Sequence, residues 1–478
     1  MTIDQSLVAK ITAEVIARVQ ESKSDTAGNS GIFATIEEAV KAARTAYNQL
    51  KKLSIAQREE LIQAMRQVAR DHAEELAEMA VTESGMGRVA DKIIKHRLVA
   101  DKTPGTEGLR TEAWTGDRGL TLLEMGPYGV IGSITPTTNP CATVLCNAIG
   151  MIAAGNAVVF SPHPTAKNTS LLTIKLLNEA IIKAGGPANL LTAVAEPSLK
   201  ATNAMMSHPG INMLVATGGP GVVKAVMSSG KKAIGAGAGN PPAVVDETAD
   251  IEKAARDIIA GCSFDNNLPC IAEKEVIVVG CVADKLMSYM QRYGAYLISG
   301  QDIDRLAKVI LTEKEELAAS GCTEKPKRSY AVNKKFVGKD AKYILSQIGI
   351  NVPDSVKVVI CEAAADHPFV LEELMMPVLP VVQVKDIDAA IELAVKVEHG
   401  NRHTAIMHSK NVDNLTRLAK AIETTIFVKN APSFAGIGVG GEGFTTFTIA
   451  GPTGEGLTSA RSFTRQRRCV LVDGFSIV

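Results

Sequence analysis

The chain has few aromatic residues and no excess of charge of either sign. Phenylalanine, tryptophan and tyrosine make up 4% of its 478 residues, and 51 lysines and arginines balance 51 aspartates and glutamates. Balanced charge gives no net field to attract nucleic acid or an anionic membrane surface, so neither is expected as a partner. The sequence also lacks a run of about 18 apolar residues, and we therefore expect no transmembrane helix.

Paired cysteines and a metal-binding histidine motif are also missing. The eight cysteines are scattered, with no CxxC pair and no secretory leader, which is typical of reduced thiols in a cytoplasmic protein. His399 and His403 are four residues apart, but glycine follows His399 where a zincin motif has glutamate. We therefore expect no metal site, and we place these two histidines on the polar surface or in a loop that satisfies them.

Helical and strand patterns alternate along most of the chain. The length of 478 residues, with 46% hydrophobic and 21% charged residues, indicates a soluble globular protein of roughly three domains. From residue 32 onward, helical stretches alternate with short apolar strands, which predicts an α/β protein. The apolar runs 157–160 and 213–216 are typical of buried parallel strands, with a helix near 171–184 between them. These elements predict a Rossmann-like sheet.

The first twenty residues form a separate segment. An apolar stripe at helical spacing predicts a short amphipathic helix over 1–20, and residues 21–31 have the small, polar composition of a linker. The stripe consists of Ile3, Leu7, Ile11, Val15 and Val19. A helix tethered in this way must bury its stripe on another surface, although an ordinary first helix of the fold stays possible. Acidic residues at positions 4 and 14 argue against a mitochondrial presequence.

One cysteine lies in a loop between two regular elements. Residues 263–273 read Ser-Phe-Asp-Asn-Asn-Leu-Pro-Cys-Ile-Ala-Glu, after a helical stretch at 254–259 and before a strand at 275–279. Cys270 therefore falls on a connection held between rigid elements, where catalytic groups are common. A cysteine beside apolar residues can also be inert packing, and the local sequence leaves both interpretations open.

Two glycine-rich segments have different meanings. Residues 436–441 satisfy GxGxxG, but no helix pattern follows them, because 444–448 is strand-like, and we reject this match. Residues 217–221, Thr-Gly-Gly-Pro-Gly, follow a strand and precede the helical 222–227. Their backbone amides could approach a pyrophosphate at a helix N-terminus, although a plain strand-to-helix turn would look the same.

Five segments in a fixed order resemble a known family. They are 134–140, 215–221, 235–242, 264–273 and 373–380. Together they resemble the aldehyde dehydrogenase superfamily, most closely its CoA-acylating branch and the propionaldehyde and acetaldehyde dehydrogenases of bacterial microcompartments. The resemblance extends over about 31–478, and the segment around Cys270 is its most specific part.

The resemblance implies a division of the chain into domains. It implies an aldehyde dehydrogenase fold, with a Rossmann-like NAD-binding domain over 32–108 and 127–236 and an α/β catalytic domain over 237–443. A β oligomerisation arm and tail would comprise 109–126 and 444–478. The helix over 1–20 would then direct the enzyme to the protein shell of a microcompartment, and the enzyme would be a homo-oligomer, a dimer or a tetramer.

The resemblance also assigns residues to chemistry. Cys270 would be the catalytic nucleophile, and the Asn139 side-chain amide, with the Cys270 backbone N–H, would stabilise the oxyanion. Glu373 would hold the nicotinamide ribose, with a solvated acid as the alternative. The other implied cofactor-binding residues are Thr135, Pro136, Ser161, Pro162, His163, Thr217, Gly218, Gly219, Gly221 and Gly235.

Two departures from the family pattern affect the expected reaction. Hydrolysing members carry a glutamate where this chain has Gly235, so the base that activates water is missing and coenzyme A is the expected acyl acceptor. Residues 161–164 replace a lysine and a glutamate near the adenosine ribose, which leaves the choice between NAD and NADP open, and the most similar group of the family favours NAD. The expected reaction is oxidation of a short-chain aldehyde to acyl-CoA and NADH, with propionaldehyde ahead of acetaldehyde. A hydrolysing enzyme with a base from elsewhere, or a non-catalytic nucleotide-binding shell component, are the alternatives.

Overall fold

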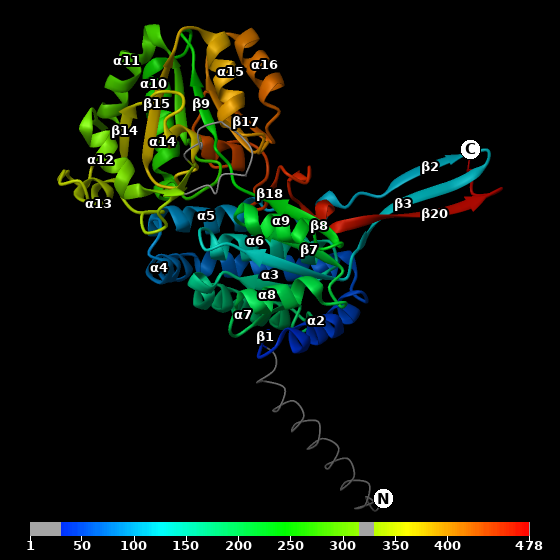
Figure 1. Cartoon of the computed structure of the whole chain (residues 1–478). Helices are drawn as coiled ribbons and strands as arrows, with labels where there is room; N and C mark the ends of the chain where they lie inside the picture. The colour runs from blue at the N-terminus through cyan, green and yellow to red at the C-terminus, as the bar shows by residue number, and fades with distance from the viewer. Residues whose placement is uncertain (1–29, 315–328, 478) are drawn as a thin grey trace, which may run out of the picture.

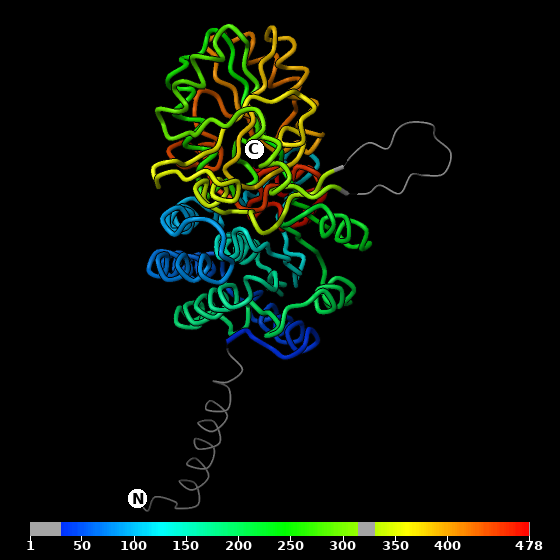
Figure 2. The backbone as a smooth tube through the Cα atoms, turned by 60° about the vertical axis from the view of Figure 1, so that its left-hand side comes forward, coloured from blue at the N-terminus to red at the C-terminus, as the bar shows by residue number. Residues whose placement is uncertain are grey.

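The computed structural model describes residues 30–314 and 329–477, which form two lobes and a projecting arm (Figure 1). The predicted helix over 1–20 and most of the predicted linker lie outside these residues. Each lobe contains one parallel sheet with helices packed against it, and the arm is a narrow antiparallel sheet. Figure 2 shows the same two lobes from another side. The predictions of an α/β protein and of buried parallel strands are confirmed.

The first lobe is built on a six-stranded parallel sheet in the order β1-β6-β5-β4-β7-β8. Its strands are β1 (Ile32–Phe33), β4 (Val130–Thr135), β5 (Ala157–Pro162), β6 (Leu191–Val194), β7 (Met213–Thr217) and β8 (Lys232–Ala236). Its helices are α2 (Ile36–Leu50), α3 (Ile55–Asp71), α4 (Ala73–Ser84), α5 (Val89–Lys102), α6 (Pro140–Ala153), α7 (Lys167–Lys183), α8 (Leu199–Ser207) and α9 (Pro220–Met227). Every residue of α6 is buried, so this helix forms the centre of the lobe.

The second lobe contains a seven-stranded parallel sheet in the order β11-β14-β15-β10-β9-β16-β17. Its strands are β9 (Pro242–Val245), β10 (Glu275–Val279), β11 (Ala295–Ile298), β14 (Val358–Glu362), β15 (Val378–Val384), β16 (Thr404–His408) and β17 (Ile426–Lys429). Its helices are α10 (Ile251–Ser263), α11 (Gly280–Arg292), α12 (Gln301–Ile310), α13 (Ala341–Ser346), α14 (Pro368–Leu371), α15 (Ile387–Val397) and α16 (Val412–Ile422). Strands β12 (Leu311–Lys314) and β13 (Ser329–Val332) form a separate two-stranded antiparallel sheet.

Three strands form the arm that projects from the first lobe (Figure 1). Hairpin strands β2 (Glu112–Gly116) and β3 (Gly119–Pro127) pair with each other, and β20 (Thr464–Val472) pairs along the whole of β3. The hairpin lies in the segment that the resemblance assigned to the arm, 109–126, and ends one residue beyond it. Strand β20 supplies the C-terminal part of the arm, whereas residues 445–450 are buried against the first lobe, where the Cys146 thiol lies 3.3 Å from Thr446 Oγ1. The division into arm and tail over 109–126 and 444–478 stays a prediction.

Residues 444–448 are not a strand, and this part of the sequence prediction was wrong. The side chains of Thr446 and Thr448 are buried and hydrogen-bonded through their hydroxyls, and only Ile449–Ala450 pair as a strand, β18. Thr448 Oγ1 donates to Asn147 Oδ1 at 2.9 Å, so the alternation reflects polar anchoring to α6 rather than a pleated sheet. The rejection of residues 436–441 as a nucleotide fingerprint is confirmed, because a 3-10 turn, Ser433–Ile437, leads into them and no helix follows.

The order of strands defines where a ligand can bind in the first lobe. From β4 the chain moves outward to β5 and β6 on one side, and then returns to place β7 and β8 on the other side. In open parallel sheets this reversal leaves a crevice at the carboxyl ends of the two central strands. Here those ends are the segments that follow Thr135 and Thr217. The fold therefore places two of the predicted cofactor segments at one crevice, while the predicted domain boundaries stay a prediction.

Candidate active site

The predicted cofactor residues gather along one edge of the six-stranded sheet. Strands β5, β4 and β7 are parallel neighbours, with Thr135 paired in register with Pro162 and Ala216 with Gly235. Thr135 and Pro136, Ser161 to His163, and Thr217 to Gly219 therefore follow the carboxyl ends of adjacent strands. Their common edge is the arrangement expected of a dinucleotide site.

The N-terminus of α9 is open in the way that a bound phosphate needs. Gly219 is the residue before the helix, and no side chain caps the helix there. A side-chain carbon added to Gly219 or Gly221 would meet nothing within 4 Å, and one added to Gly218 would meet only Val222, at 3.1 Å. The first backbone N–H groups of a helix lack partners within it, so they can donate to a phosphate that approaches this surface.

Other predicted cofactor residues are already engaged by neighbours. Ser161 Oγ lies 2.8 Å from Thr202 Oγ1, and Thr217 Oγ1 lies 2.8 Å from Thr448 Oγ1. His163 Nδ1 lies 2.8 Å from the Thr165 hydroxyl, and burial lowers the pKa of this imidazole. The hydrogen bonds of these side chains hold the segments at the carboxyl ends of the strands in place. The groups that remain free to contact a cofactor there are mainly backbone atoms.

The loop that carries Cys270 is held in an unusual backbone conformation. Asp265, Asn266 and Asn267 all have positive φ angles, of 48°, 54° and 65°. Asparagine and aspartate adopt this left-handed region more readily than other side chains, which explains why the sequence Asp-Asn-Asn occurs here. Side-chain bonds hold the conformation, since Asn266 Nδ2 donates to the Gly338 carbonyl at 2.9 Å and Asn267 Nδ2 to the Cys262 carbonyl at 3.0 Å.

Cys270 combines partial access with a thiol that is protonated at rest. It is partly exposed, whereas Cys262 on α10 is fully buried and Cys281 is exposed. Burial of the thiol and the nearby Glu373 raise the pKa of Cys270 to about 12, while Lys274 and Lys95 act in the opposite direction. The nucleophilic thiolate must therefore form when ligands change this electrostatic balance.

Gly239 is the point at which three functional groups meet. A side-chain carbon at Gly239 would lie 2.7 Å from the Cys270 carbonyl oxygen and 2.9 Å from the His403 ring. The Gly239 N–H donates to Glu373 Oε1 at 3.3 Å, and burial raises the pKa of that carboxyl. The connection between the two sheets thus brings Glu373 and His403 to the loop of Cys270.

His403 was misplaced by the sequence analysis. It is 1% exposed, its Nε2 has no hydrogen-bond partner among the described residues, and burial lowers its pKa to about 4. An unpaired nitrogen beside the nucleophile is available to a ligand. The spacing to His399 misled the prediction, because His399 instead places Nε2 2.9 Å from the Leu371 carbonyl, away from this site.

Asn139 lies at the start of α6 and is bound through its carbonyl oxygen. Lys95 Nζ donates to Asn139 Oδ1 and to Asp265 Oδ2, and Lys92 Nζ donates to Asp265 Oδ2 at 3.0 Å. Burial lowers the pKa of Lys95 to about 8, against the opposing effect of Asp265. Burial alone would raise the pKa of Asp265, but Lys95 and Lys92 lower it. This cluster was not predicted, and it joins Asn139 to the loop of Cys270.

Gly235 lies inside β8 rather than at its end. Its N–H donates to Thr453 Oγ1 at 3.1 Å, and a side-chain carbon there would lie 2.7 Å from Val223 Cγ1 of α9. The missing side chain therefore lets α9 pack closely on the strand. A contact of Gly235 with the cofactor stays a prediction.

Gly87 gives a stability test of the Cys270 loop. Gly85 and Gly87 both have positive φ, but a side-chain carbon at Gly87 would lie 2.1 Å from Asp265 Oδ1, whereas one at Gly85 would meet only Lys339 Nζ, at 3.0 Å. We expect Gly85→Ala to lower the free energy of unfolding by about 1 kcal/mol, from backbone strain alone. Gly87→Ala should lower it by about 3 kcal/mol or more, because Asp265 must leave its lysines. Urea midpoints measure the difference, and equal losses would contradict this packing.

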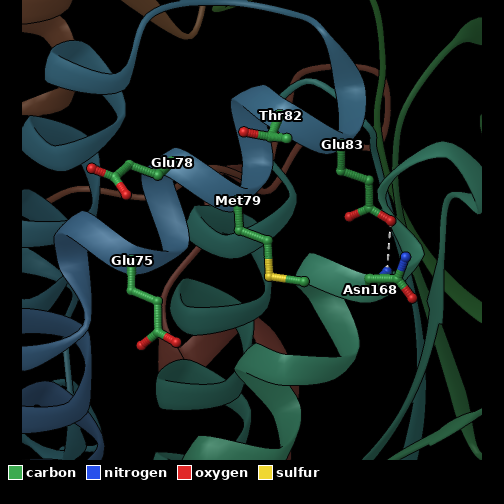
Figure 3. Close-up of a pocket in the computed structure, with 6 residues that line it drawn as sticks. All are labelled: Glu75, Glu78, Met79, Thr82, Glu83 and Asn168. Atoms are coloured by element: carbon green, nitrogen blue, oxygen red, sulfur yellow. Dashed lines mark hydrogen bonds between the residues drawn. The ribbon is translucent and has the colours of Figure 1, made fainter.

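A hollow of about 500 Å³ on the first lobe lies apart from these residues (Figure 3). Its lining includes Glu75, Glu78 and Met79 of α4. Glu83 at its rim accepts from the backbone N–H groups of Asn168 and Thr169, both at 2.8 Å, and so caps α7. The carboxylate there has a structural role. A second hollow, of about 340 Å³, lies between α9 and residues 237–238, beside the crevice described above.

Two absences hold for residues 30–314 and 329–477. Three or more histidine, cysteine, aspartate or glutamate side chains nowhere gather there as metal ligands would. No helix in these ranges has both the length and the apolar character needed to cross a membrane.

Curated relatives cover the whole chain. The acetaldehyde dehydrogenase (acetylating) EutE of Salmonella typhimurium is 49% identical over 479 residues, 100% of this chain and of the relative. The propanal dehydrogenase (CoA-propanoylating) of the same organism is 50% identical over 474 residues, 99% of this chain and 98% of the relative.

Solved structures agree with the arrangement of the lobes and arm. The propionaldehyde dehydrogenase of Rhodopseudomonas palustris, with bound CoA and an acylated cysteine, is 55% identical with a TM-score of 0.88, over 93% of this chain and 98% of that chain. The propionaldehyde dehydrogenase of the Clostridium phytofermentans fucose utilisation microcompartment is 55% identical with a TM-score of 0.89, over 94% and 100%. An engineered glycolyl-CoA reductase with bound NADP+ is 54% identical with a TM-score of 0.89, over 94% and 99%. The model of the aldehyde dehydrogenase family matches residues 5–447, and the chain belongs to this family.

Proposed function

We propose that the protein is a CoA-acylating aldehyde dehydrogenase that oxidises short-chain aldehydes to acyl-CoA. The observation that carries the proposal is the partly exposed Cys270 near Glu373, with Asn139 joined to its loop through Lys95 and Asp265, on a chain that has glycine at position 235. Relatives about half identical over the full chain are named as acetylating and CoA-propanoylating enzymes, and a related structure holds CoA and an acylated cysteine.

The first half of the reaction uses groups from both lobes. The Cys270 thiolate attacks the aldehyde carbonyl carbon, and the negative charge that develops on the oxygen needs donors at that position. Asn139 Nδ2 and the Cys270 backbone N–H supply them. A bound NAD(P) would supply the hydride acceptor for the adduct on Cys270. The open N-terminus of α9 fits its pyrophosphate, and Glu373 fits its nicotinamide ribose. The product on the enzyme is a thioester of Cys270.

The second half of the reaction transfers the acyl group to a thiol. Water needs a general base to attack a thioester, and Gly235 offers no side chain for that purpose. The pKa of the CoA thiol is several units below that of water, and the thiol is a better nucleophile, so it attacks the thioester without that base. Acyl-CoA leaves and the Cys270 thiol is restored.

We propose a nicotinamide coenzyme, NAD or NADP, and a short-chain aldehyde as the substrate. Residues 161–164 lack the lysine and glutamate of many relatives, which leaves the coenzyme open; the resemblance favours NAD, while a structural relative binds NADP+. Propionaldehyde is placed ahead of acetaldehyde. A pocket distinguishes one methylene by only about 10- to 200-fold, so activity on both is expected.

The assay that tests the proposal measures NADH and the acyl product in the presence and absence of CoA. Propionaldehyde, NAD and CoA should give NADH and propionyl-CoA in equal amounts. Without CoA, NADH formation should stop after about one equivalent per active site. Continued NADH formation with free propionate would identify a hydrolysing enzyme, and no NADH with either coenzyme would indicate a protein without this activity.

The arm gives a surface for assembly with a second copy. Its exposed apolar side chains are Trp114 on β2 and Val470, Leu471 and Val472 on β20. Apolar groups on a projecting sheet are typical of an interface, and we propose a homo-oligomer, a dimer or a tetramer. We also propose that residues 32–108 and 127–236 form the NAD-binding domain and that residues 237–443 form the catalytic domain.

We further propose that residues 1–20 direct the enzyme to a microcompartment shell, because a relative in structure comes from such a compartment. Deleting 1–20 should leave kcat/KM unchanged and abolish association with coexpressed shell proteins, because the sequence has a small, polar segment of linker composition between the apolar stripe and residue 32. A fluorescent protein fused to residues 1–20 should gather in the shells, and the same fusion with Leu7→Glu and Ile11→Glu is the control. Diffuse fluorescence of the unaltered fusion, or a large fall in activity of the truncated enzyme, would contradict the targeting role and indicate that residues 1–20 are a structural part of the fold.

A further inference from the structure

The Asn139 side chain has a defined orientation in the structure. Its Oδ1 accepts from Lys95 Nζ, so the amide nitrogen is directed away from the lysine. The nearest partner of Nδ2 is Thr138 Oγ1 at 3.5 Å, a weak contact at the limit of hydrogen bonding. The amide therefore keeps its N–H groups for another acceptor. An amide turned by half a rotation would present an oxygen to the site instead, and an oxygen repels an oxyanion.

Lys95 is itself fixed in place. Its side chain is 1% exposed, and it also donates to Asp265 Oδ2, whose side chain is 0% exposed. Lys92, one turn earlier on α5, lies on the same helix face and donates to the same oxygen at 3.0 Å. Asp265 in turn accepts from the Arg88 backbone N–H at 2.7 Å. A buried lysine with two such acceptors has one position available to it.

We propose that Lys95 is a positioning residue that orients the Asn139 amide as an oxyanion donor and ties it to the loop of Cys270. This inference rests on the proposed role of Asn139. The ammonium group binds the carbonyl end of the amide, which excludes the flipped orientation. Its positive charge also draws electron density toward Oδ1, which strengthens donation from Nδ2. The shared bond to Asp265 means that the donor and the nucleophile loop keep a constant separation.

Lys92 provides a matched control within the same cluster. It is 2% exposed and has the same carboxylate partner as Lys95, but its second bond is to the Thr138 backbone carbonyl at 3.1 Å rather than to the Asn139 side chain. If the cluster only stabilised the fold, loss of either lysine would have the same effect. If Lys95 positions the amide, only its loss should affect the reaction strongly.

Each lysine can be removed without stranding the carboxylate. Lys95→Met leaves Asp265 paired with Lys92, and Lys92→Met leaves it paired with Lys95. Removing the carboxylate would instead leave two lysines together. Methionine is unbranched and only one atom shorter than lysine, so it fills most of the same space, and we expect folded enzymes with similar losses in urea midpoint. Lys95→Gln keeps one donor on a side chain of similar shape, and it serves if Lys95→Met does not fold.

The experiment is a double-mutant cycle between positions 95 and 139. Asn139→Ala should lower kcat by about 100-fold or more, as expected for loss of an oxyanion donor. Lys95→Met should lower kcat by about 10- to 100-fold with little change in KM for NAD, because a misplaced donor acts on the transition state. Lys92→Met should stay within about threefold of the parent. In the Asn139→Ala background, Lys95→Met should cause no further loss.

The outcomes separate this inference from the proposed function. Independent losses, with Lys95→Met lowering kcat as much in the Asn139→Ala background as alone, would overturn the positioning role. A Lys95→Met enzyme with the kcat of Lys92→Met would overturn it as well. If Asn139→Ala kept the parent kcat, the proposed oxyanion role of Asn139 would fail first. For Lys95→Gln, an intermediate kcat that again disappears in the Asn139→Ala background supports the inference, and additive losses contradict it.

Discussion

Cys270→Ala should lower NADH formation by more than about 10³-fold while the protein stays folded and still binds NAD. The variant removes the nucleophile and with it the thioester, and no other described group replaces a missing covalent step. The side chain lost is small, and Cys270 forms no disulfide, so the core should not collapse. Steady-state NADH formation from propionaldehyde measures the effect, with NAD binding and the urea midpoint as checks on the fold.

Two other cysteines serve as controls for Cys270→Ala. Cys281→Ala removes an exposed thiol on α11 and should leave the rate unchanged. Cys262→Ala removes a fully buried thiol of α10 that accepts from Asn267 Nδ2 at 3.3 Å, so it should lower stability more than activity. More than a few percent of parent activity in Cys270→Ala would show that another group is the nucleophile.

Strand and helix positions were predictable where the sequence pattern was local. The apolar run at 275–279 is strand β10 at those bounds, and the run at 213–216 lies within β7. Thr217 to Gly221 lies between that strand and α9, as its glycines predicted. The strand prediction for 444–448 was wrong because a run of threonine and phenylalanine looks the same whether it pairs with a strand or bonds to side chains of a neighbouring helix, here Cys146 and Asn147 of α6.

The sequence predicted only those site residues that lie in segments resembling the family. The sequence singled out Cys270, Asn139 and Glu373, and the structure brings the loop of Cys270 to Glu373 through Gly239 and to Asn139 through Lys95. Their roles stay proposals. Lys95 could not be found, because a lysine on a helix is usually exposed, and its burial depends on an aspartate 170 residues away. His403 was missed for a similar reason, since only the packing against Gly239 places it beside the nucleophile.

Restoring a carboxylate at position 235 should convert part of the reaction to hydrolysis. Gly235→Glu supplies the base that hydrolysing relatives use, and general bases contribute about 10²- to 10⁴-fold. The structure adds a condition, since a side-chain carbon at Gly235 would lie 2.7 Å from Val223 Cγ1. We therefore expect Gly235→Glu alone to fold poorly or to displace α9, and the pair Gly235→Glu, Val223→Ala to relieve the overlap.

Free propionate formed without CoA measures the conversion. We expect the pair to raise this rate by about 100-fold over the parent, because the thioester on Cys270 gains a base for attacking water. Val223→Ala alone is the control for the altered packing of α9 and should give no more acid than the parent. Gly235→Gln, Val223→Ala has the same size without a base and should also fail to release acid. If the glutamate variant folds, binds NAD and forms a thioester but releases no more acid than the glutamine variant, the missing base does not explain the dependence on CoA. The preference for a thiol would then come from a surface that holds CoA close to the thioester.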